Sequence, residues 1–180
     1  MISIHGGVNP TQFIGLSTCL FAFVCCVIAW IGGRGFPRFR RIAALLAVLE
    51  AALFLDMMFS GRWLLHDWLE NEAKARGLYA ARAGPQIAAL CFLGGCAAAG
   101  IAWTLWRLRG KQGATLAACG GILSLVCWCV EAVSLHAVDR VLYRTFDGIM
   151  RVTLIWIACA LMTGVGILGE MLAARAHAHP

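Results

Sequence analysis

Two histidines with acidic neighbours are the residues whose types and spacing could best hold a ligand. His66 is followed directly by Asp67, and His136 has Asp139 three residues further on. On a helix, positions i and i+3 share a face, so an aspartate there can ligate a metal ion with the histidine or orient its imidazole. Imidazole and carboxylate ligands suit zinc, copper or iron. The sequence therefore predicts a metal site at His66 and His136, with Asp67 and Asp139 as ligands or their partners.

The same two histidines allow other interpretations. In one, His66 and His136 are the axial ligands of a single b-type haem, and nearby arginines meet its propionates. In another they are interfacial histidines satisfied by acids, with no cofactor, and in a last one they line a site for an organic ligand such as a quinone. The polar residues that could complete a pocket around them are Arg62, Glu70, Tyr79, Arg82, Gln86, Ser134, Arg140 and Arg144.

Three carboxylates interrupt apolar segments, where ionisable groups are costly and usually functional. Glu50 lies about 12 Å along its segment, Asp56 about 9 Å further, and Glu131 about 26 Å into a later one, at 1.5 Å per helical residue. Their depths predict a buried polar relay that leads toward the histidines. A relay of this kind is the basis of a second function hypothesis, a small proton-coupled transporter or channel subunit.

The elements that must position these residues are five long apolar segments. The chain has 180 residues, is 61% hydrophobic and 13% charged, and has a mean hydropathy of +0.80. This composition excludes a disordered chain, a secreted disulfide scaffold and an ordinary soluble enzyme. Each segment has about 20 residues or more, enough to cross a hydrocarbon core of about 30 Å. The segments are Gln12–Ile31, Ile42–Gly61, Pro85–Trp106, Ala114–Leu135 and Ile149–Met171.

The expected fold is an all-α integral membrane protein, a bundle of five transmembrane helices in one domain, residues 1–180. The tails and loops are too short for a separate soluble domain. Residues 62–76 are predicted to form a helical outer loop between spans two and three, supported by two i, i+4 ion pairs, Glu70 with Lys74 and Glu72 with Arg76. Gly77 is expected to end that helix, and residues 136–151 are expected to be partly helical.

Two short basic connections set the expected orientation. Residues 32–41 contain four arginines and no acid, and Arg107, Arg109 and Lys111 follow the third span. Both connections lie on one side of a five-span bundle, which the positive-inside tendency makes cytoplasmic. We expect a bacterial-type inner membrane, with the N-terminus outside and the C-terminus in the cytoplasm. Because the basic residues lie between spans, a nucleic-acid partner is not expected.

Small residues within the spans predict close helix packing. They recur four apart in the third span, as Gly95 with Ala99 and Cys96 with Gly100, and in the fifth as Ala160 with Gly164. Such spacing lets helices approach closely, either inside one chain or in a seam with a second copy or another membrane protein. All nine cysteines fall inside predicted spans without a C-x-x-C pair and are interpreted as packing residues.

The leading function hypothesis is an outer-facing His/carboxylate site that binds a metal or haem in a redox or assembly component of a membrane complex. At the level of architecture, five spans with histidines on two of them resemble the membrane haem subunits of respiratory dehydrogenases, which when they hold two haems typically place histidines at both faces. This chain offers a pair at one face. The alternatives are the proton-coupled transporter or channel subunit and a structural membrane subunit without cofactor. No motif assigns a catalytic residue.

Overall fold

A computed structural model of the chain describes residues 10–133, 136–146 and 149–176, apart from the side chains of His136, Ala137 and Phe146. Within these ranges, five helices are long and apolar enough to cross a membrane. They are α1 (Pro10–Gly32), α2 (Pro37–Phe59), α4 (Ala83–Arg107), α5 (Gln112–Val133) and α7 (Arg151–Ala176). The expectation of an all-α membrane bundle is confirmed at this level, and the five apolar helices indicate a lipid bilayer as their surroundings.

The helix boundaries follow local backbone chemistry. Pro37 is the first residue of α2, where its missing N–H costs no helical hydrogen bond. Ser60 ends α2 with a φ of 57°, and the next helix, α3 (Gly61–Ala75), begins directly after it. Gly77 follows α3 with a φ of +68°, the left-handed conformation that favours glycine. Both the helix at 62–76 and its stop at Gly77 are therefore confirmed.

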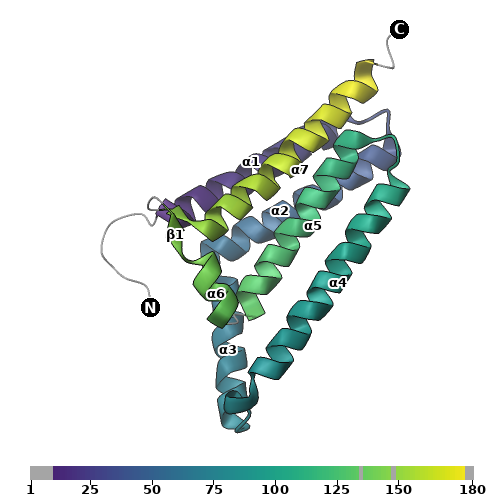
Figure 1. Cartoon of the computed structure of the whole chain (residues 1–180). Helices are drawn as coiled ribbons and strands as arrows, with labels where there is room; N and C mark the ends of the chain where they lie inside the picture. Colours follow the sequence, from purple (N-terminus) through teal and green to yellow (C-terminus); the bar gives the residue numbers. More distant parts are fainter. Residues whose placement is uncertain (1–9, 134–135, 147–148, 177–180) are drawn as a thin grey trace.

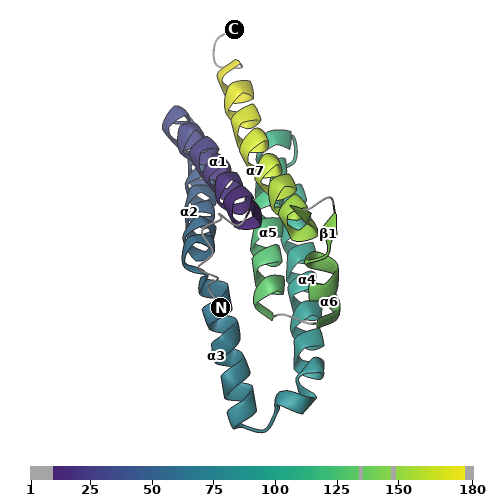
Figure 2. The same ribbon diagram turned by 90° about the vertical axis from the view of Figure 1, so that its left-hand side faces the viewer.

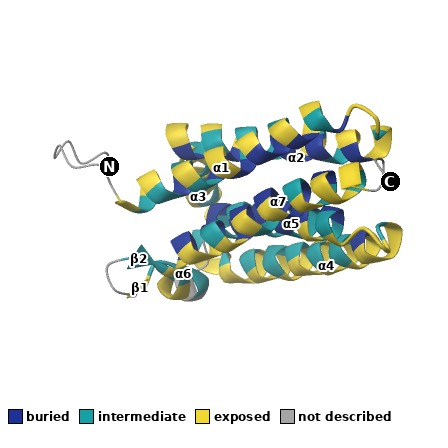
Figure 3. Ribbon diagram, turned by 90° about the horizontal axis from the view of Figure 1, so that it is seen from above, coloured by how far each residue is buried: buried dark blue, intermediate teal, exposed yellow. Residues whose placement is uncertain are grey.

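Four of the spans, α1, α2, α5 and α7, form the core, and the remaining span, α4, lies outside it. In Figure 1, α7 packs between α1 and α5, and α4 runs along the outer side of α5. The buried residues lie on the facing sides of α1, α2, α5 and α7, whereas α4 is exposed along most of its length (Figure 3). Large apolar side chains such as Leu45, Val48 and Phe92 are exposed, which is favourable against lipid tails.

Helix α3 continues α2 beyond the bundle and turns back to α4 through the short turn η1 (Tyr79–Ala81), as Figure 2 shows. Between α5 and α7 lie α6 (His136–Leu142) and an antiparallel hairpin of β1 (Thr145–Phe146) and β2 (Ile149–Met150). The hairpin was not predicted, because strands of two residues leave no readable alternation. The end of the bundle with α3, α6 and the hairpin is termed the α3 end, and the opposite end, with residues 33–36 and 108–111, the basic end.

Glycines allow α5 and α7 to pack backbone to backbone. A methyl group at Gly120 would lie 2.7 Å from the backbone nitrogen of Thr163, and one at Gly166 would lie 2.7 Å from that of Ala117. Gly164, in the predicted fifth-span pair, meets Phe21 of α1 at 2.7 Å by the same measure. Gly94 of α4 has no described atom within 4 Å of such a position. This side of α4 therefore makes no contact with the described part of the bundle at Gly94.

Candidate functional site

The Glu131 carboxylate is the centre of a buried polar network at the α3 end. Glu131 is 3% exposed, and its Oε1 accepts a hydrogen bond from Trp156 Nε1 of α7 at 2.9 Å. Its Oε2 accepts from the Tyr143 hydroxyl at 3.3 Å and lies 3.2 Å from Arg62 Nη1 at the start of α3. The ion pair and the two neutral donors offset the cost of burying the carboxylate. Because these donors come from separate elements, the network joins α3, α5 and α7.

Asp56 binds the backbone of the same arginine. Its Oδ1 accepts the backbone N–H of Arg62 at 2.7 Å, so the carboxylate caps the first turn of α3, where the helix dipole favours a negative charge. Two of the three predicted relay acids therefore meet at Arg62, Asp56 at its backbone and Glu131 at its side chain. Arg62 Nε and Nη1 have no hydrogen-bond partner among the described residues, so the contact of Nη1 with Glu131 is an ion pair.

Glu50, the third relay acid, lies deeper in the bundle. It is about 20 Å from the first residue of α2 and about 14 Å from the last, and it is 1% exposed. Its Oε1 has no hydrogen-bond partner in the described part of the chain, and neither has the buried Thr163 hydroxyl of α7. No cation among those residues pairs with it. A carboxyl at this depth without a cation is a candidate functional group in its own right.

The predicted metal ligands are only partly described by the structure. One ligand atom each from His66, Asp67 and Glu70 of α3 lies within 4.8 Å of the others. His66 Nε2 lies 3.6 Å from Glu70 Oε2, and Lys74 Nζ lies 2.8 Å from Glu70 Oε1. The hydrogen bond from Lys74, with a second one from Tyr79, lowers the pKa of Glu70. An ion at this site would compete with the lysine ammonium for that oxygen.

The remaining predicted ligands lie outside this group. The side chain of His136, and Ser134 altogether, fall outside the described residues. Asp139 of α6 is described, has interactions of its own and is not a member of the His66 group. The structure therefore supports an α3 cluster of His66, Asp67 and Glu70, and leaves the pairing of His66 with His136 as a prediction.

Aromatic rings connect the α3 cluster to the Glu131 network. The Trp63 ring centroid lies 6.1 Å from that of His66 and 6.1 Å from that of Tyr143. Burial, with the nearby Glu131 carboxylate, raises the pKa of Tyr143, so its hydroxyl remains protonated and able to donate at neutral pH. His66 therefore packs against the Trp63 ring, which in turn packs on Tyr143, a hydrogen-bond donor to Glu131.

The other predicted pocket residues are dispersed. Gln86 Nε2 donates to the Val133 carbonyl oxygen at 3.1 Å and ties α4 to α5. The Arg82 guanidinium carbon lies 3.8 Å from the centre of the Tyr79 ring, at the turn between α3 and α4. Arg140 and Arg144 are exposed. Among the described residues, these side chains lie in the α3 cluster, in the Glu131 network and at this turn, and a single pocket around both histidines stays a prediction.

Two members of the network, Tyr143 and Trp156, were not among the site residues predicted from the sequence. They lie 12 and 25 residues from Glu131 along the chain, so no local spacing links them to it. A weak signal existed for Tyr143, one of the two tyrosines of the chain, because it follows a polar segment. Trp156 carries no signal that separates it from a packing residue.

Comparison of the chain with known protein families, with curated proteins and with solved structures found no match. The α3 cluster, the Glu131 network and Glu50 are therefore interpreted from their own geometry.

Proposed function

We propose that the chain is a membrane protein that binds a divalent metal ion on α3 through His66, Asp67 and Glu70. The observation that supports this proposal is the grouping of one ligand atom from each residue within 4.8 Å. One imidazole and two carboxylates form a nitrogen and oxygen ligand set, which suits zinc or iron and also accommodates copper. The incoming cation takes the place of the Lys74 ammonium at Glu70 Oε1.

The Glu131 network supports this proposal by fixing α3. The Arg62 side chain, which is 13% exposed, is ion-paired with Glu131 at the first turn of α3, and Trp63 packs between Tyr143 and His66. A metal ligand needs its imidazole held in one orientation by its neighbours. With the basic end in the cytoplasm, the ion faces the outside and serves a redox or assembly role in a larger membrane complex. In the haem version, His136 supplies the second axial ligand.

The test is a metal titration of the full-length protein in detergent. After chelation, the protein is titrated with Zn²⁺ by calorimetry and with Co²⁺ by visible absorption, and one ion per chain is expected. His66→Ala should abolish binding, and Glu70→Gln should weaken it at least tenfold. Glu72→Gln is the matched control, because Glu72 lies on the same helix, pairs with Arg76 and is outside the cluster. Failure to bind one ion, or an equal loss in the control, would refute the proposal.

An absorption spectrum of the same preparation separates haem from a simple metal ion. A Soret band that is lost when His66→Ala and His136→Ala are combined would replace the metal proposal with the haem version. Stoichiometric metal without that band would support the α3 cluster.

Glu50 favours a second function, proton coupling. We propose as the alternative that its carboxyl takes up and releases a proton within a small transporter or channel subunit, because it is buried at mid-depth and no described cation compensates its charge. In proteoliposomes with an internal pH dye and an imposed potassium diffusion potential, Glu50→Gln should abolish proton entry and leave metal binding unchanged. If wild type and Glu50→Gln give equal flux, the alternative fails and Glu50 has a structural role.

A further inference from the structure

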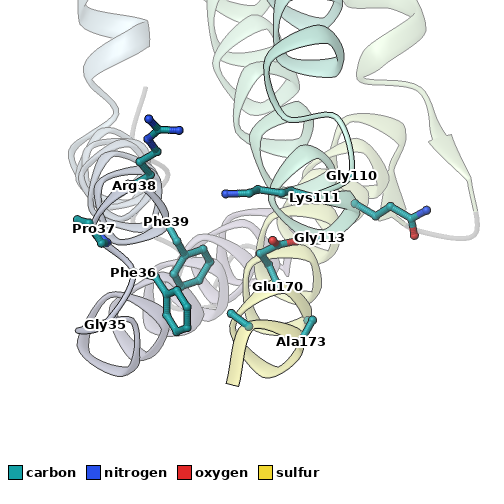
Figure 4. Close-up of a pocket in the computed structure, with 13 residues that line it drawn as sticks. Gly35, Phe36, Pro37, Arg38, Phe39, Gly110, Lys111, Gly113, Glu170 and Ala173 are labelled. Carbon is teal, nitrogen blue, oxygen red and sulfur yellow. The ribbon is translucent and has the colours of Figure 1, made fainter. Parts of the chain in front are cut away.

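A cavity of about 800 Å³ lies at the basic end of the bundle, far from α3. It is partly open to the surroundings and is lined by the start of α2, the start of α5 and the end of α7 (Figure 4). Figure 4 shows the rings of Phe36 and Phe39 on one side and Glu170 and Ala173 on the other. Glycines form much of the remaining wall, so the lining is mainly apolar and backbone: Gly35, Gly110, Gly113 and Gly169.

Two cations border this apolar space. Lys111 precedes α5 and extends across the cavity toward α2 in Figure 4, whereas Arg38, in the first turn of α2, lies at the rim with its side chain pointing away from the Phe36 and Phe39 rings. Neither has an ion-pair partner among the described residues. The acid of the cavity is Glu170, whose Oε2 accepts the backbone N–H of Ala114 at 3.2 Å. The Glu170 charge is thereby directed at the first turn of α5, where the helix dipole favours it.

The surrounding end of the bundle is strongly basic. Residues 32–41, 107–113 and 168–176 together hold eight basic side chains and one acid, a net charge of +7. Some of these cations have other contacts. The Arg40 guanidinium lies 5.0 Å from the centre of the Trp30 ring, and Arg175 donates to the Gly32 carbonyl oxygen at 3.3 Å. The charge next to the cavity therefore favours an anion, and Arg38 and Lys111 are the cations that line it.

We propose that this cavity binds an anionic phospholipid, with the headgroup phosphate between Arg38 and Lys111 and the adjoining acyl chains against Phe36 and Phe39. The cavity falls in the range of roughly 300–1,000 Å³ that holds drug-sized ligands, and is too large for a single ion. It lies at the ends of spanning helices, which is the depth of lipid headgroups. Basic pockets between transmembrane helices bind such headgroups in general. An anion with an attached apolar part can contact both the cations and the phenyl rings that line the cavity, whereas inorganic phosphate can contact only the cations.

The test measures lipid binding to the full-length protein in neutral detergent. Native mass spectrometry gives the apparent Kd of the first bound lipid for dioleoyl phosphatidylglycerol and for dioleoyl phosphatidylcholine. We expect phosphatidylglycerol to bind at least tenfold more tightly. Arg38→Gln with Lys111→Gln should raise its Kd about 25-fold, since each basic residue near a lipid contributes about a fivefold effect. The matched control, Arg34→Gln with Arg109→Gln, removes the same charge from the same connections outside the cavity and should change the Kd less than twofold.

Three results would overturn the proposal. Equal affinity for the two lipids would mean that headgroup charge does not determine binding. An equal loss of phosphatidylglycerol affinity in the two double variants would mean that binding depends on the overall surface charge of this end and not on the cavity. Displacement of phosphatidylglycerol by millimolar inorganic phosphate would assign the cavity to a free anion. If the Arg38 and Lys111 double variant fails to fold, the Glu170→Gln variant tests the proposal instead. It removes the acid, keeps an acceptor for Ala114 and should tighten phosphatidylglycerol binding two- to fivefold, and an unchanged Kd would count against the proposal.

Discussion

Glu131 is the residue whose loss should matter most to the α3 end. Glu131→Gln keeps an acceptor for Trp156 but leaves Arg62, whose side chain is 13% exposed, without its counter-ion. Breaking a buried pair on one side costs about 3–5 kcal/mol of unfolding free energy, and we expect a loss of that size in denaturation in mixed micelles. Glu72→Gln, which breaks the exposed pair with Arg76, should cost less than about 1 kcal/mol.

A double variant separates the charge effect from a general loss of packing. Arg62→Met combined with Glu131→Gln removes both charges, so much of the stability lost in Glu131→Gln should return. If the double variant is less stable than Glu131→Gln by the full cost of Arg62→Met alone, the two residues are not coupled and the network does not fix α3.

Lys74 should oppose metal binding at the α3 cluster. Lys74→Gln removes the ammonium that lies 2.8 Å from Glu70 Oε1, so the affinity for Zn²⁺ at pH 7 should rise several-fold. The hydrogen bond from Lys74 lowers the pKa of Glu70 and keeps it ionised to lower pH. In the variant that pKa rises, so Glu70 is protonated sooner on acidification and the advantage should shrink toward pH 4. Zinc titrations of both proteins across pH 4–7 measure this, and identical affinities at pH 7 would exclude Glu70 as a ligand.

At the residue scale, the sequence identifies the costly groups but not their partners. Glu131 and Glu50 stand out because a carboxylate in an apolar segment is rare, and both are buried. The i, i+4 relation of His66 and Glu70 is equally readable. The donors Tyr143 and Trp156 reach Glu131 only after α6 and α7 have packed, and long-range packing leaves no spacing in the chain.

At the scale of elements, the α5–α7 contact depends on glycine. A methyl group at Gly120 would lie 2.7 Å from the Thr163 nitrogen and 2.8 Å from the Cys159 oxygen. These are backbone atoms that cannot rotate away, so Gly120→Ala must separate the helices. We expect the substitution to lower the free energy of unfolding by about 1–3 kcal/mol. Gly94→Ala is the matched control on α4. Its new methyl group meets no described atom within 4 Å, and the better helix propensity of alanine should leave stability unchanged or raised by up to about 1 kcal/mol. Equal effects of the two substitutions in detergent unfolding would contradict this packing.

Sequence pattern locates the elements more reliably than it assigns their faces. The spans and α3 were predictable because length and composition define them. The small residues of the third span predicted a close contact, yet Gly94 and Gly95 face away from the bundle, and the closest helix contact uses Gly113, Gly120 and Gly166. The spacing of small residues shows that one face of a helix lacks large side chains. Only the packed bundle shows which element lies against that face. Whether a second protein covers that side of α4 is therefore a separate question from the fold.

At the scale of the whole molecule, the two ends of the bundle differ in chemistry. The basic end holds the cavity with Arg38 and Lys111, and the α3 end holds the buried carboxylate network and the α3 cluster. The existence of five spans was predictable from sequence. The peripheral place of α4 was not, since all five spans have comparable apolar length and nothing in a single chain ranks their neighbours.

The difference between the ends predicts one orientation in the membrane. Because the positive-inside tendency acts on short basic connections, Arg109 should lie in the cytoplasm and Asn71 of α3 outside. Single cysteines at these exposed positions, Asn71→Cys and Arg109→Cys, can be labelled in intact cells with a membrane-impermeant maleimide. The wild-type protein is the background control, since its nine cysteines all fall within the spans. Asn71→Cys should label at once, and Arg109→Cys only after permeabilisation. The reverse pattern would place the α3 cluster in the cytoplasm and the lipid cavity in the outer leaflet. Immediate labelling of both positions would mean that the chain does not cross the membrane between them as a single span, α4.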